Sequence, residues 1–281
     1  MLKILKKGDV LVALKCELFN DNYQNYKSYH IPKAQLVIAD CPYALGTKFY
    51  GSNPAWYVNG DIKNGESDKA GKAAFLTDFN FNLAEYFHFC SKLLIKEPKE
   101  RGKSPCMIVF CSFQQQQMVI ETAKKHGFNN YIPLVFIKPT SPQVLKANMR
   151  ICGATEYALV LYREKLPKFN NDGHMILNWF EWQKDGANIP KIHPTQKPVK
   201  VLEKLINIFT DKGDVVIDPC AGSGSTLRAA HNLGRNAYGF EVNKKFYKEA
   251  KEKMLNFENE PKSLFDWLTE NSQSERNVKN K

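Results

Sequence analysis

The sequence predicts an α/β protein with a mostly parallel sheet and helices on both faces. Short apolar runs alternate with longer amphipathic ones, and one of the short runs ends in a glycine-rich turn that opens a helix. No apolar run reaches the roughly 18 residues that a membrane span needs. The length of 281 residues fits one large domain or two small ones. We expect a single domain over residues 1–257 and a polar tail over residues 258–281.

Composition narrows the class of protein further. Hydrophobic residues make up 43% of the chain and charged residues 25%, so wholesale disorder and fibrous structure are excluded. The 7 cysteines include no Cys-x-x-Cys pair, which favours reduced thiols over disulfides or a metal site. The amino end lacks the continuous apolar stretch of a secretory signal, so we expect a soluble cytoplasmic protein. A net charge of +11 favours a polyanionic partner, although solvated surface lysines would produce the same value.

The predicted elements follow the chain in order. Helix 199–209 has apolar residues at three- and four-residue steps after Pro198, and Gly234 is a typical stop for the helix before it. Three irregular stretches, 46–71, 138–153 and 163–191, are long enough to indicate functional loops. Strands are expected at residues 35–39, 107–111, 134–137, 158–162, 215–217 and 237–240. Helices are expected at residues 79–95, 115–126, 199–209, 225–233 and 244–257.

The glycine-rich turn follows the strand at 215–217. Gly222 and Gly224 let the backbone approach a ligand closely, and the next strand ends at Glu241, where a nucleoside ribose presents its hydroxyls. Leu227 occupies the third glycine position of a dinucleotide site, and the Gly-Lys-Ser/Thr ending of a P-loop is missing. The turn therefore favours a nucleoside without a pyrophosphate, such as S-adenosylmethionine. A tight strand–helix turn of an unrelated α/β domain is the alternative.

A second polar turn lies upstream, where Asp40, Pro42 and Tyr43 follow the strand at 35–39. An aromatic ring can stack on a flat heterocycle, while a carboxylate and a backbone carbonyl can accept the two hydrogens of an exocyclic amine. Enzymes that modify a base in duplex DNA extrude that base and hold it by such contacts. An ordinary turn with a proline stop would contain the same residues, so this motif alone does not decide.

The segment 193–198, His-Pro-Thr-Gln-Lys-Pro, connects the two turns. Together with Asp-Cys-Pro-Tyr at 40–43, the glycine turn at 218–226 and the segment 234–241, it resembles the β-group amino-methyltransferases of DNA over residues 36–257. The resemblance implies a Rossmann-like, circularly permuted fold, S-adenosylmethionine as cofactor and DNA as partner, as in restriction-modification systems. An aspartate at position 40 is more typical of enzymes acting on adenine N6; methylation of cytosine N4 remains the alternative.

The resemblance also implies roles for individual residues. Cys41 stands where the family has proline; it keeps the carbonyl but lacks the fixed φ angle, so we expect activity to survive. A catalytically degenerate DNA-binding descendant is the rival interpretation. The catalytic residues would be Asp40, Cys41, Pro42 and Tyr43, and the cofactor would contact Asp218, Pro219, Ala221, Gly222, Ser223, Gly224, Glu241, Thr195, Lys197 and Asp9.

Sequence recognition is expected in residues 163–191, the position of the variable region in the family, with help from residues 46–71. A second subunit of a homodimer would be another source of DNA contacts. Pro105-Cys106 and Pro219-Cys220 match the dipeptide of C5-cytosine methyltransferases, but the motif order here is the reverse of that family. We interpret Cys106 as a small buried hydrophobe. The expected DNA-binding cations are Lys146, Arg150, Arg163, Lys165 and Lys168.

Overall fold

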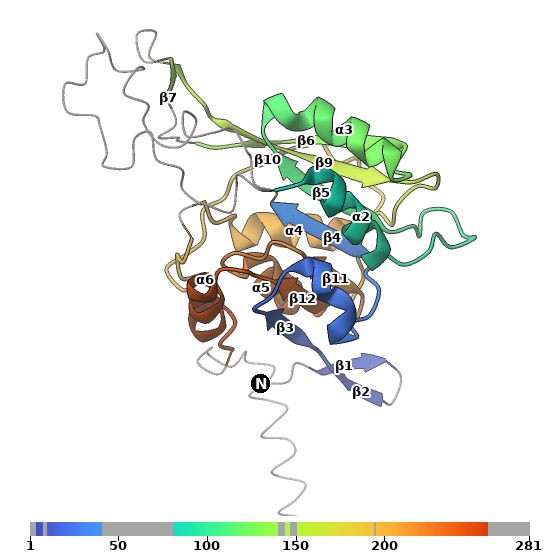
Figure 1. Cartoon of the computed structure of the whole chain (residues 1–281), viewed down its shortest axis with the longest axis vertical. Helices are drawn as coiled ribbons and strands as arrows, with labels where there is room; N and C mark the ends of the chain where they lie inside the picture. The colour runs from blue at the N-terminus through green and yellow to red at the C-terminus, as the bar shows by residue number, and fades with distance from the viewer. Residues whose placement is uncertain are drawn as a thin grey trace, which may run out of the picture.

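The computed structural model describes residues 4–7, 10–40, 81–139, 144–146, 151–193 and 195–257. Their centre is an eight-stranded sheet in the order β10-β6-β9-β5-β4-β11-β12-β3 (Figure 1). These strands are β3 (Cys16–Phe19), β4 (Leu36–Asp40), β5 (Cys106–Cys111), β6 (Asn130–Ile137), β9 (Thr155–Tyr162), β10 (Trp179–Glu181), β11 (Val215–Asp218) and β12 (Asn236–Phe240). Two separate hairpins pair β1 (Ile4–Lys7) with β2 (Val10–Ala13) and β7 (Val144–Lys146) with β8 (Ile151–Cys152).

The strands run in one direction except for β9, which is antiparallel to both of its neighbours, β5 and β6. The register pairs Asp40 of β4 with Phe110 of β5, and Asp218 of β11 with Gly239 of β12. The strand ends that carry Asp40, Asp218 and Glu241 therefore lie at one edge of the sheet, which we call the carboxyl edge. The opposite edge, where these strands begin, is the amino edge.

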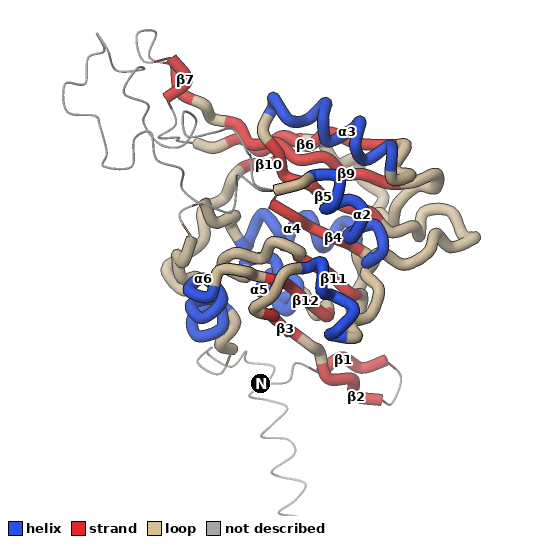
Figure 2. The backbone as a smooth tube through the Cα atoms, viewed as in Figure 1, coloured by secondary structure: helices blue, strands red, loops and turns tan. Residues whose placement is uncertain are grey.

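Helices cover both faces of the sheet (Figure 2). One face packs against α2 (Leu83–Leu93), α3 (Gln116–Lys125) and the 3₁₀ helix η1 (Tyr23–Tyr29). The other packs against α4 (Val199–Phe209) and α5 (Ser225–Asn232), with contributions from the π-helical turn Ala250–Met254 that follows α6 (Lys244–Glu249). A short 3₁₀ turn, η4 (Phe113–Gln115), precedes α3.

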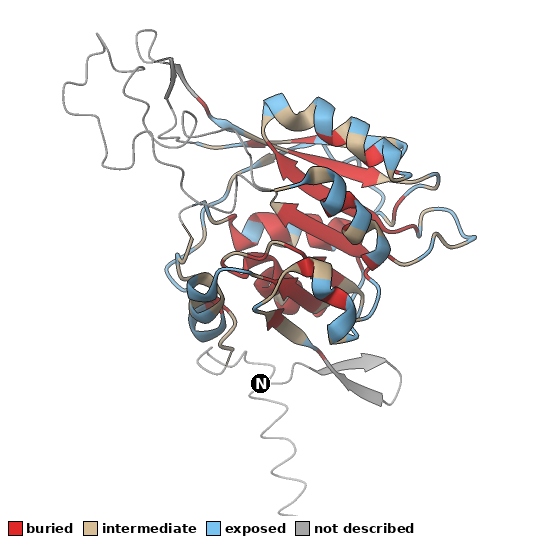
Figure 3. Cartoon of the chain, viewed as in Figure 1, coloured by how far each residue is buried: buried red, intermediate tan, exposed pale blue. Residues whose placement is uncertain are grey.

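Strand β5 shows why the sheet needs both layers. Its side chains are all buried, with Ile108 and Phe110 facing the layer of α4 and α5, and Met107 and Val109 facing the layer of α2 and α3. A strand buried on both faces has an unbroken apolar run instead of an alternating one. Figure 3 shows the central strands buried between helices whose outer faces are exposed.

Helix α4 is the most sharply specified helix. The structure begins it at Val199 and ends it at Phe209, as its apolar spacing predicts. Pro198 is its N-cap and has no side-chain acceptor to offer, and the carboxylate of Asp185 instead accepts hydrogen bonds from the amides of Val199 and Lys200 at 2.9 and 3.2 Å. These bonds satisfy amides that the helix itself leaves unpaired.

The α/β class, the parallel centre of the sheet and the helices on both faces are confirmed. The strands that the sequence did not predict lie at the two sides of the main sheet, β3 and β10, or in the small hairpins. Strand β10 has only 3 residues, and Trp179 at its start is 45% exposed. Short strands of this kind lack the apolar run by which the buried strands were predicted.

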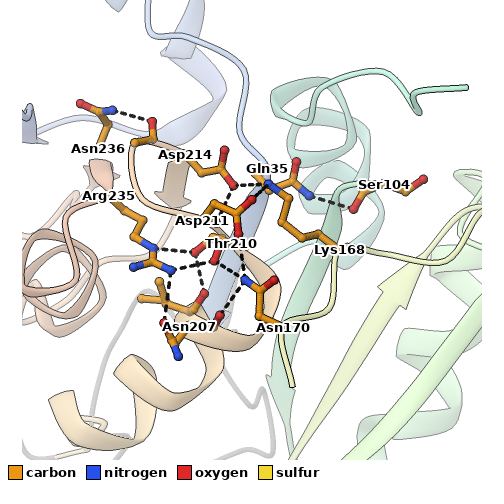
Figure 4. Close-up of polar contacts among 12 residues, drawn as sticks. Gln35, Ser104, Lys168, Asn170, Asn207, Thr210, Asp211, Asp214, Arg235 and Asn236 are labelled. Carbon is orange, nitrogen blue, oxygen red and sulfur yellow. Dashed lines mark hydrogen bonds and ion pairs between the residues drawn. The ribbon is translucent and has the colours of Figure 1, made fainter. Parts of the chain in front are cut away.

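A group of polar residues, which we call the amino-edge cluster, occupies the edge where β11 begins (Figure 4). Its centre is Arg235, which is 3% exposed and donates to the hydroxyl of Thr210 at 3.0 Å and to its carbonyl at 2.7 Å. The Thr210 hydroxyl in turn donates to the carbonyl of Ile206. The cluster consists of Lys168, Asn170, Asn207, Thr210, Asp211, Asp214 and Arg235.

Candidate active site

Acidic side chains from three strands meet at the carboxyl edge. Asp40 ends β4 and Asp218 ends β11, and these two strands are direct neighbours in the sheet. The chain leaves β4 toward β5 on one side and leaves β11 toward β12 on the other. In open α/β sheets, ligands bind in the crevice at such a point of reversal. The topology therefore places a candidate site between Asp40, Asp218 and Glu241.

The glycine turn follows β11 and leads into α5. Gly222 and Gly224 have φ angles of 50° and 78°, a left-handed conformation in which side chains are strained. The amide of Ala221 donates to the carbonyl of Phe240 at 2.9 Å, which ties the turn to the end of β12. A Cβ atom at Gly239 would lie 2.7 Å from Leu227 Cδ1, so that glycine lets α5 pack closely on β12.

Glu241 is fixed by this same turn. Its Oε2 accepts a hydrogen bond from the amide of Gly222 at 2.8 Å, and its Oε1 accepts one from the amide of Asn243 at 2.6 Å. Burial raises the pKa of the Glu241 carboxyl, although these two amides oppose the shift. Each carboxylate oxygen can accept more than one hydrogen bond, so the fixed group can also bind hydroxyls.

Asp218 is buried beneath the turn, 4% exposed. Burial raises its pKa to about 7, while hydrogen bonds from the Thr226 side chain and the Cys220 amide oppose the shift. The neighbouring charges of Asp40 and Glu241 raise it further. A carboxyl group held near its titration point at neutral pH is a common feature of binding and catalytic sites.

His193 forms a wall beside the glycine turn. Its Nδ1 lies 3.0 Å from the hydroxyl of Thr195, and its ring centre lies 4.5 Å from that of Phe246. A Cβ atom at Gly222 would be 3.9 Å from the His193 ring. Burial, together with the charge of Lys197, lowers the pKa of His193 to about 4, so the imidazole is neutral at physiological pH.

Lys197 lies against Asp40. Its ammonium donates to Asp40 Oδ2 at 2.7 Å, and its side chain is 8% exposed. The sequence predicts this lysine at the methionine end of the cofactor pocket, which stays a prediction; the structure shows its direct bond to the first residue of the catalytic motif. Burial alone would lower the pKa of Lys197, but the charges of Asp40 and Glu156 outweigh burial and raise it.

The positions of the remaining predicted residues divide into two groups. Pro219, Ala221 and Ser223 lie in the glycine turn, and Thr195 contacts His193 beside it. Other predicted residues lie outside the described part of the chain: Cys41, Pro42, Tyr43, Asp9, Arg150 and the segment 46–71, as well as the side chain of Lys146.

Three of the predicted DNA-binding cations need a correction. Arg163, Lys165 and Lys168 follow β9, and because β9 is antiparallel, its end lies at the amino edge, away from Asp40. Arg163 donates to the carbonyl of Ser91 at 3.0 Å, and Lys165 donates to the carbonyl of Pro98 at 2.7 Å. Lys168 forms ion pairs of 2.8 Å with Asp211 and Asp214 (Figure 4). These contacts stabilise the fold, so we no longer assign the three cations to DNA.

The predicted recognition segment 163–191 is therefore split by the sheet. Its first part lies at the amino edge. Strand β10 then runs alongside β6 toward the carboxyl edge, and the residues from Trp182 onward follow it there. Trp182 packs against the core, whereas Lys184 and Lys191 are exposed. Only the second part of the segment is placed to meet a ligand near Asp40.

Sequence reasoning did not single out Glu156 or Lys138. Glu156, near the start of β9, lies with its Oε2 3.9 Å from the ammonium of Lys197, and its Oε1 pairs with Lys138. Neither residue belongs to a motif, and only the antiparallel pairing of β9 brings them to the carboxyl edge. Among the described residues, no group of acidic, histidine or cysteine side chains could hold a metal ion, and no helix is long and apolar enough to cross a membrane.

Cys106 has the role that the sequence predicts for it. It begins β5, its side chain is fully buried among the apolar residues of the α4 and α5 layer, and burial raises the pKa of its thiol. A thiol in such surroundings is not a nucleophile. Position 106 is therefore a packing position and no candidate for the cysteine of a C5-cytosine methyltransferase.

A doubly wound sheet with a glycine turn, an acidic residue after the next strand and a carboxylate on the neighbouring strand defines an α/β enzyme with a nucleoside cofactor. Comparison with known families gives the particular class. Residues 34–252 match the model of the N6/N4 DNA methylases, and the chain belongs to this family. Enzymes of this family transfer a methyl group from S-adenosylmethionine to DNA.

Relatives and solved structures agree with this assignment. The Type II methyltransferase M.HinfI of Haemophilus influenzae is 27% identical over 278 residues, 92% of this chain and 74% of that protein. The DNA adenine methyltransferase YhdJ of Escherichia coli K12 is 25% identical over 255 residues, 83% and 80% of the two chains. The crystal structure of the M1.HpyAVI–SAM complex has a TM-score of 0.61 at 23% identity and covers 86% of this chain and 99% of its own. The cytosine-N4-specific PvuII DNA methyltransferase has a TM-score of 0.58 at 16% identity and covers 88% and 91%.

Proposed function

We propose that this protein transfers the methyl group of S-adenosylmethionine to the exocyclic N6 amine of adenine in DNA. The observation that carries the proposal is the meeting of Asp40 and Asp218 at the ends of adjacent parallel strands. The end of β4, with Asp40, would then bind the acceptor base, and the end of β11, with Asp218, would bind the methyl donor. A transfer reaction requires this proximity, because holding two reactants together removes much of the entropic barrier.

The cofactor would occupy the crevice over the glycine turn. Glu241, already fixed by the Gly222 and Asn243 amides, would accept hydrogen bonds from the ribose hydroxyls. Asp218 and the backbone at Gly222 and Gly224 would line the methionine end, where the positive charge of the amino group favours an ionised carboxylate. The neutral ring of His193 would close one side; Pro219, Ala221, Ser223 and Thr195 complete the lining.

The chemistry needs little beyond positioning. The methyl group of a sulfonium is already activated, whereas the lone pair of an aromatic amine is delocalised into its ring. Asp40 and the carbonyl of Cys41 would accept the two hydrogens of that amine and localise the lone pair for in-line attack. Tyr43 would stack on the extruded base. The nitrogen–carbon bond would form as the sulfur–carbon bond breaks, S-adenosylhomocysteine would leave, and the methylated amine would pass one proton to solvent.

Adenine is favoured over cytosine on two grounds. Asp40 opens the motif with the residue more typical of adenine enzymes, and one relative that spans most of the chain is named a DNA adenine methyltransferase. Methylation of cytosine N4 is the second candidate, since the PvuII enzyme has a similar fold. Both bases present an amine with two hydrogens, so the Asp40 carboxylate does not discriminate between them.

Recognition of DNA would fall to residues around the carboxyl edge. The second part of the segment 163–191 brings exposed Lys184 and Lys191 to this edge. Together with residues 46–71 and a second subunit of a homodimer, these lysines would contact phosphates and position the bases. A DNA methyltransferase of this kind, like the Type II methyltransferase of Haemophilus influenzae to which the chain is similar, would act on DNA in the cytoplasm.

The test is to identify the methylated base. Purified protein is incubated with unmethylated DNA and S-adenosylmethionine, the DNA is digested to nucleosides, and the products are separated by mass spectrometry. We expect N6-methyldeoxyadenosine. N4-methyldeoxycytidine would show that the second candidate is right. If neither product forms while DNA and cofactor both bind, the chain is a degenerate DNA-binding descendant.

A further inference from the structure

A row of alternating charges extends from Asp40 along the carboxyl edge of the sheet. The ammonium of Lys197 lies 2.7 Å from Asp40 Oδ2 and 3.9 Å from Glu156 Oε2, and Glu156 pairs in turn with Lys138. The four residues come from β4, the segment before α4, β9 and the end of β6. They bring two positive and two negative charges together, so the row is balanced as a whole.

The Lys197 ammonium is enclosed by rings as well as carboxylates. It lies 5.1 Å from the ring centre of Phe110 and 5.9 Å from that of Trp182. Lys138 lies 5.1 Å from the same Trp182 ring. An ammonium near an aromatic face is attracted by the ring quadrupole, more strongly where water is excluded. The lysine is thus held at a fixed place with its charge retained.

From this geometry we infer that Lys197 and Glu156 are positioning residues for Asp40: Lys197 keeps the Asp40 carboxylate ionised and oriented toward the amine, and Glu156 keeps Lys197 in place. The inference rests on the proposed function, in which Asp40 accepts hydrogens from the target amine. Only the ionised carboxylate can accept with both oxygens, since a protonated one donates from one of them.

The energetics of a buried ion pair do not favour a purely structural role for Lys197 and Asp40. Taking a charge pair out of water costs several kcal/mol per ion before the pair attracts, so apolar residues commonly stabilise a core as well or better. Asp40 is already fixed by the β4–β5 ladder, and Lys197 follows a segment that Gln196 braces through the Ile192 amide and the Pro190 carbonyl. The fold at both positions is therefore held by other contacts. The Lys197–Asp40 pair is better explained by the effect of the ammonium on the charge and orientation of the Asp40 carboxylate.

Other titratable groups surround Asp40 and bear on its charge. Asp218 on β11 and the Cys111 thiol on β5 interact with it electrostatically, and both have raised pKa values, chiefly because they are buried. Lys197 in turn lowers the pKa of His193. The facing groups are Lys197, Glu156, Lys138, Asp218, Cys111 and His193. Lys197 is the member of this set that lies within hydrogen-bond distance of Asp40 and carries a positive charge.

The experiment measures single-turnover methyl transfer against pH at saturating S-adenosylmethionine. The variants are Lys197→Met, Lys197→Arg and Glu156→Gln, with Lys200→Met as the matched control because that lysine is exposed on α4. We expect Lys197→Met to lower the transfer rate about 100-fold, the effect of misplacing a reacting group. Its acid limb should move to higher pH, while cofactor affinity changes less than about threefold.

Lys197→Arg keeps the positive charge, so it should recover most of the rate and the wild-type acid limb. Glu156→Gln should lower the rate less than Lys197→Met does, because Lys197 loses one of its two carboxylate partners, and its acid limb should not move to higher pH, since a negative charge near Asp40 is removed. Lys200→Met should match the wild type. Melting temperatures establish that each variant is folded; if Lys197→Met does not fold, Lys197→Arg and Glu156→Gln decide.

A wild-type rate in Glu156→Gln would remove Glu156 from the inference. Two results would overturn the role of Lys197 while leaving the proposed function intact: a wild-type acid limb in Lys197→Met, or a loss of cofactor affinity as large as the loss of rate. The second result would return Lys197 to the cofactor pocket. A wild-type protein that methylates neither adenine nor cytosine would instead overturn the proposed function, and the inference with it.

Discussion

The two edges of the central sheet use polar side chains in opposite ways. At the amino edge, Arg235 and Thr210 satisfy one another and nearby carbonyls, and Lys168 pairs with Asp211 and Asp214 (Figure 4). At the carboxyl edge, buried Asp218 and half-buried Glu241 are held by backbone amides and have no cation at ion-pair distance among the described residues, while Asp40 pairs with Lys197.

The pKa shifts follow this difference. Hydrogen bonds to Lys168 lower the pKa of Asp211, which favours its charged form. Burial raises the pKa values of Asp218 and Glu241 and lowers that of His193, and each of these shifts favours the neutral form. Burial also lowers the pKa of Arg235 at the amino edge, but its hydrogen-bond partners belong to the fold. The carboxylates of the carboxyl edge whose charge burial disfavours and no cation offsets are the ones that we assign to the cofactor.

The largest expected effect is on catalysis at the carboxyl edge. Asp40→Ala should lower methyl transfer by about 10³-fold or more, because the amine loses its main acceptor. Cofactor affinity should stay within about twofold, since the role of Asp40 is at the amine. Transfer of tritiated methyl groups and calorimetric titration measure the two properties. Near-normal turnover in a folded Asp40→Ala protein would remove Asp40 from the mechanism.

The amino edge should respond in stability and not in activity. Arg235→Ala removes several hydrogen bonds of a buried guanidinium and should lower the free energy of unfolding by about 3 kcal/mol. Urea denaturation measures the loss, with Arg101→Ala, an exposed arginine, as the control. The transfer rate per folded molecule should not change. A transfer rate that falls in Arg235→Ala without a loss of stability would show that the amino edge takes part in catalysis.

Asp218→Asn should separate stability from binding. The pKa of Asp218 is raised to about 7 from an unfolded value near 3.8, so between these values the folded protein binds more protons than the unfolded chain. Its stability therefore falls as pH rises through that window and is constant above it. At pH 8 the asparagine variant should be more stable than the wild type by on the order of 4 kcal/mol, with little difference at pH 4.

The same Asp218→Asn variant should bind S-adenosylmethionine at least about tenfold more weakly at pH 8, because the cofactor loses a charge-assisted partner. Thermal unfolding at the two pH values and calorimetry test both parts. A variant that is destabilised at pH 8, or that binds the cofactor normally, would show that Asp218 is a structural residue like those of the amino edge.

The smallest effect concerns DNA affinity. Lys184→Gln and Lys191→Gln, at the carboxyl edge, should each reduce the salt dependence of DNA binding by about one unit of slope. Lys165→Gln and Lys168→Gln should leave that slope unchanged, because these lysines contact the protein itself. Filter binding over a range of salt concentrations compares the four. A smaller slope in the Lys165 and Lys168 variants, with an unchanged slope in the Lys184 and Lys191 variants, would show that DNA binds at the amino edge.

The sequence predicts the centre of this molecule better than its sides. Strands β4, β5, β11 and β12 are buried on both faces and therefore have continuous apolar runs, and helix α4 has a regular apolar spacing. Strands β3 and β10 depend on a neighbour for pairing and have no comparable signal.

The same division holds for the site. Asp218 and Glu241 can be placed at strand ends from local pattern alone. The Lys197–Asp40 bond joins residues 157 positions apart, and the Lys168–Asp214 bond joins residues 46 apart, so neither is visible before the chain is folded. For that reason the sequence alone predicts Lys197 at the cofactor and Lys168 at DNA. In the structure, Lys197 is bound to Asp40, and Lys168 is bound to Asp211 and Asp214.

The most direct test of the account is a calorimetric titration of S-adenosylmethionine against three proteins: the wild type, Glu241→Gln and Lys168→Met. We expect Glu241→Gln to weaken binding by about 1.5–3 kcal/mol, because the ribose hydroxyls lose a charged acceptor. Lys168→Met should bind the cofactor like the wild type, even if its unfolding temperature falls. Equal affinity in all three proteins, or weaker binding in Lys168→Met alone, would contradict a cofactor site at the carboxyl edge.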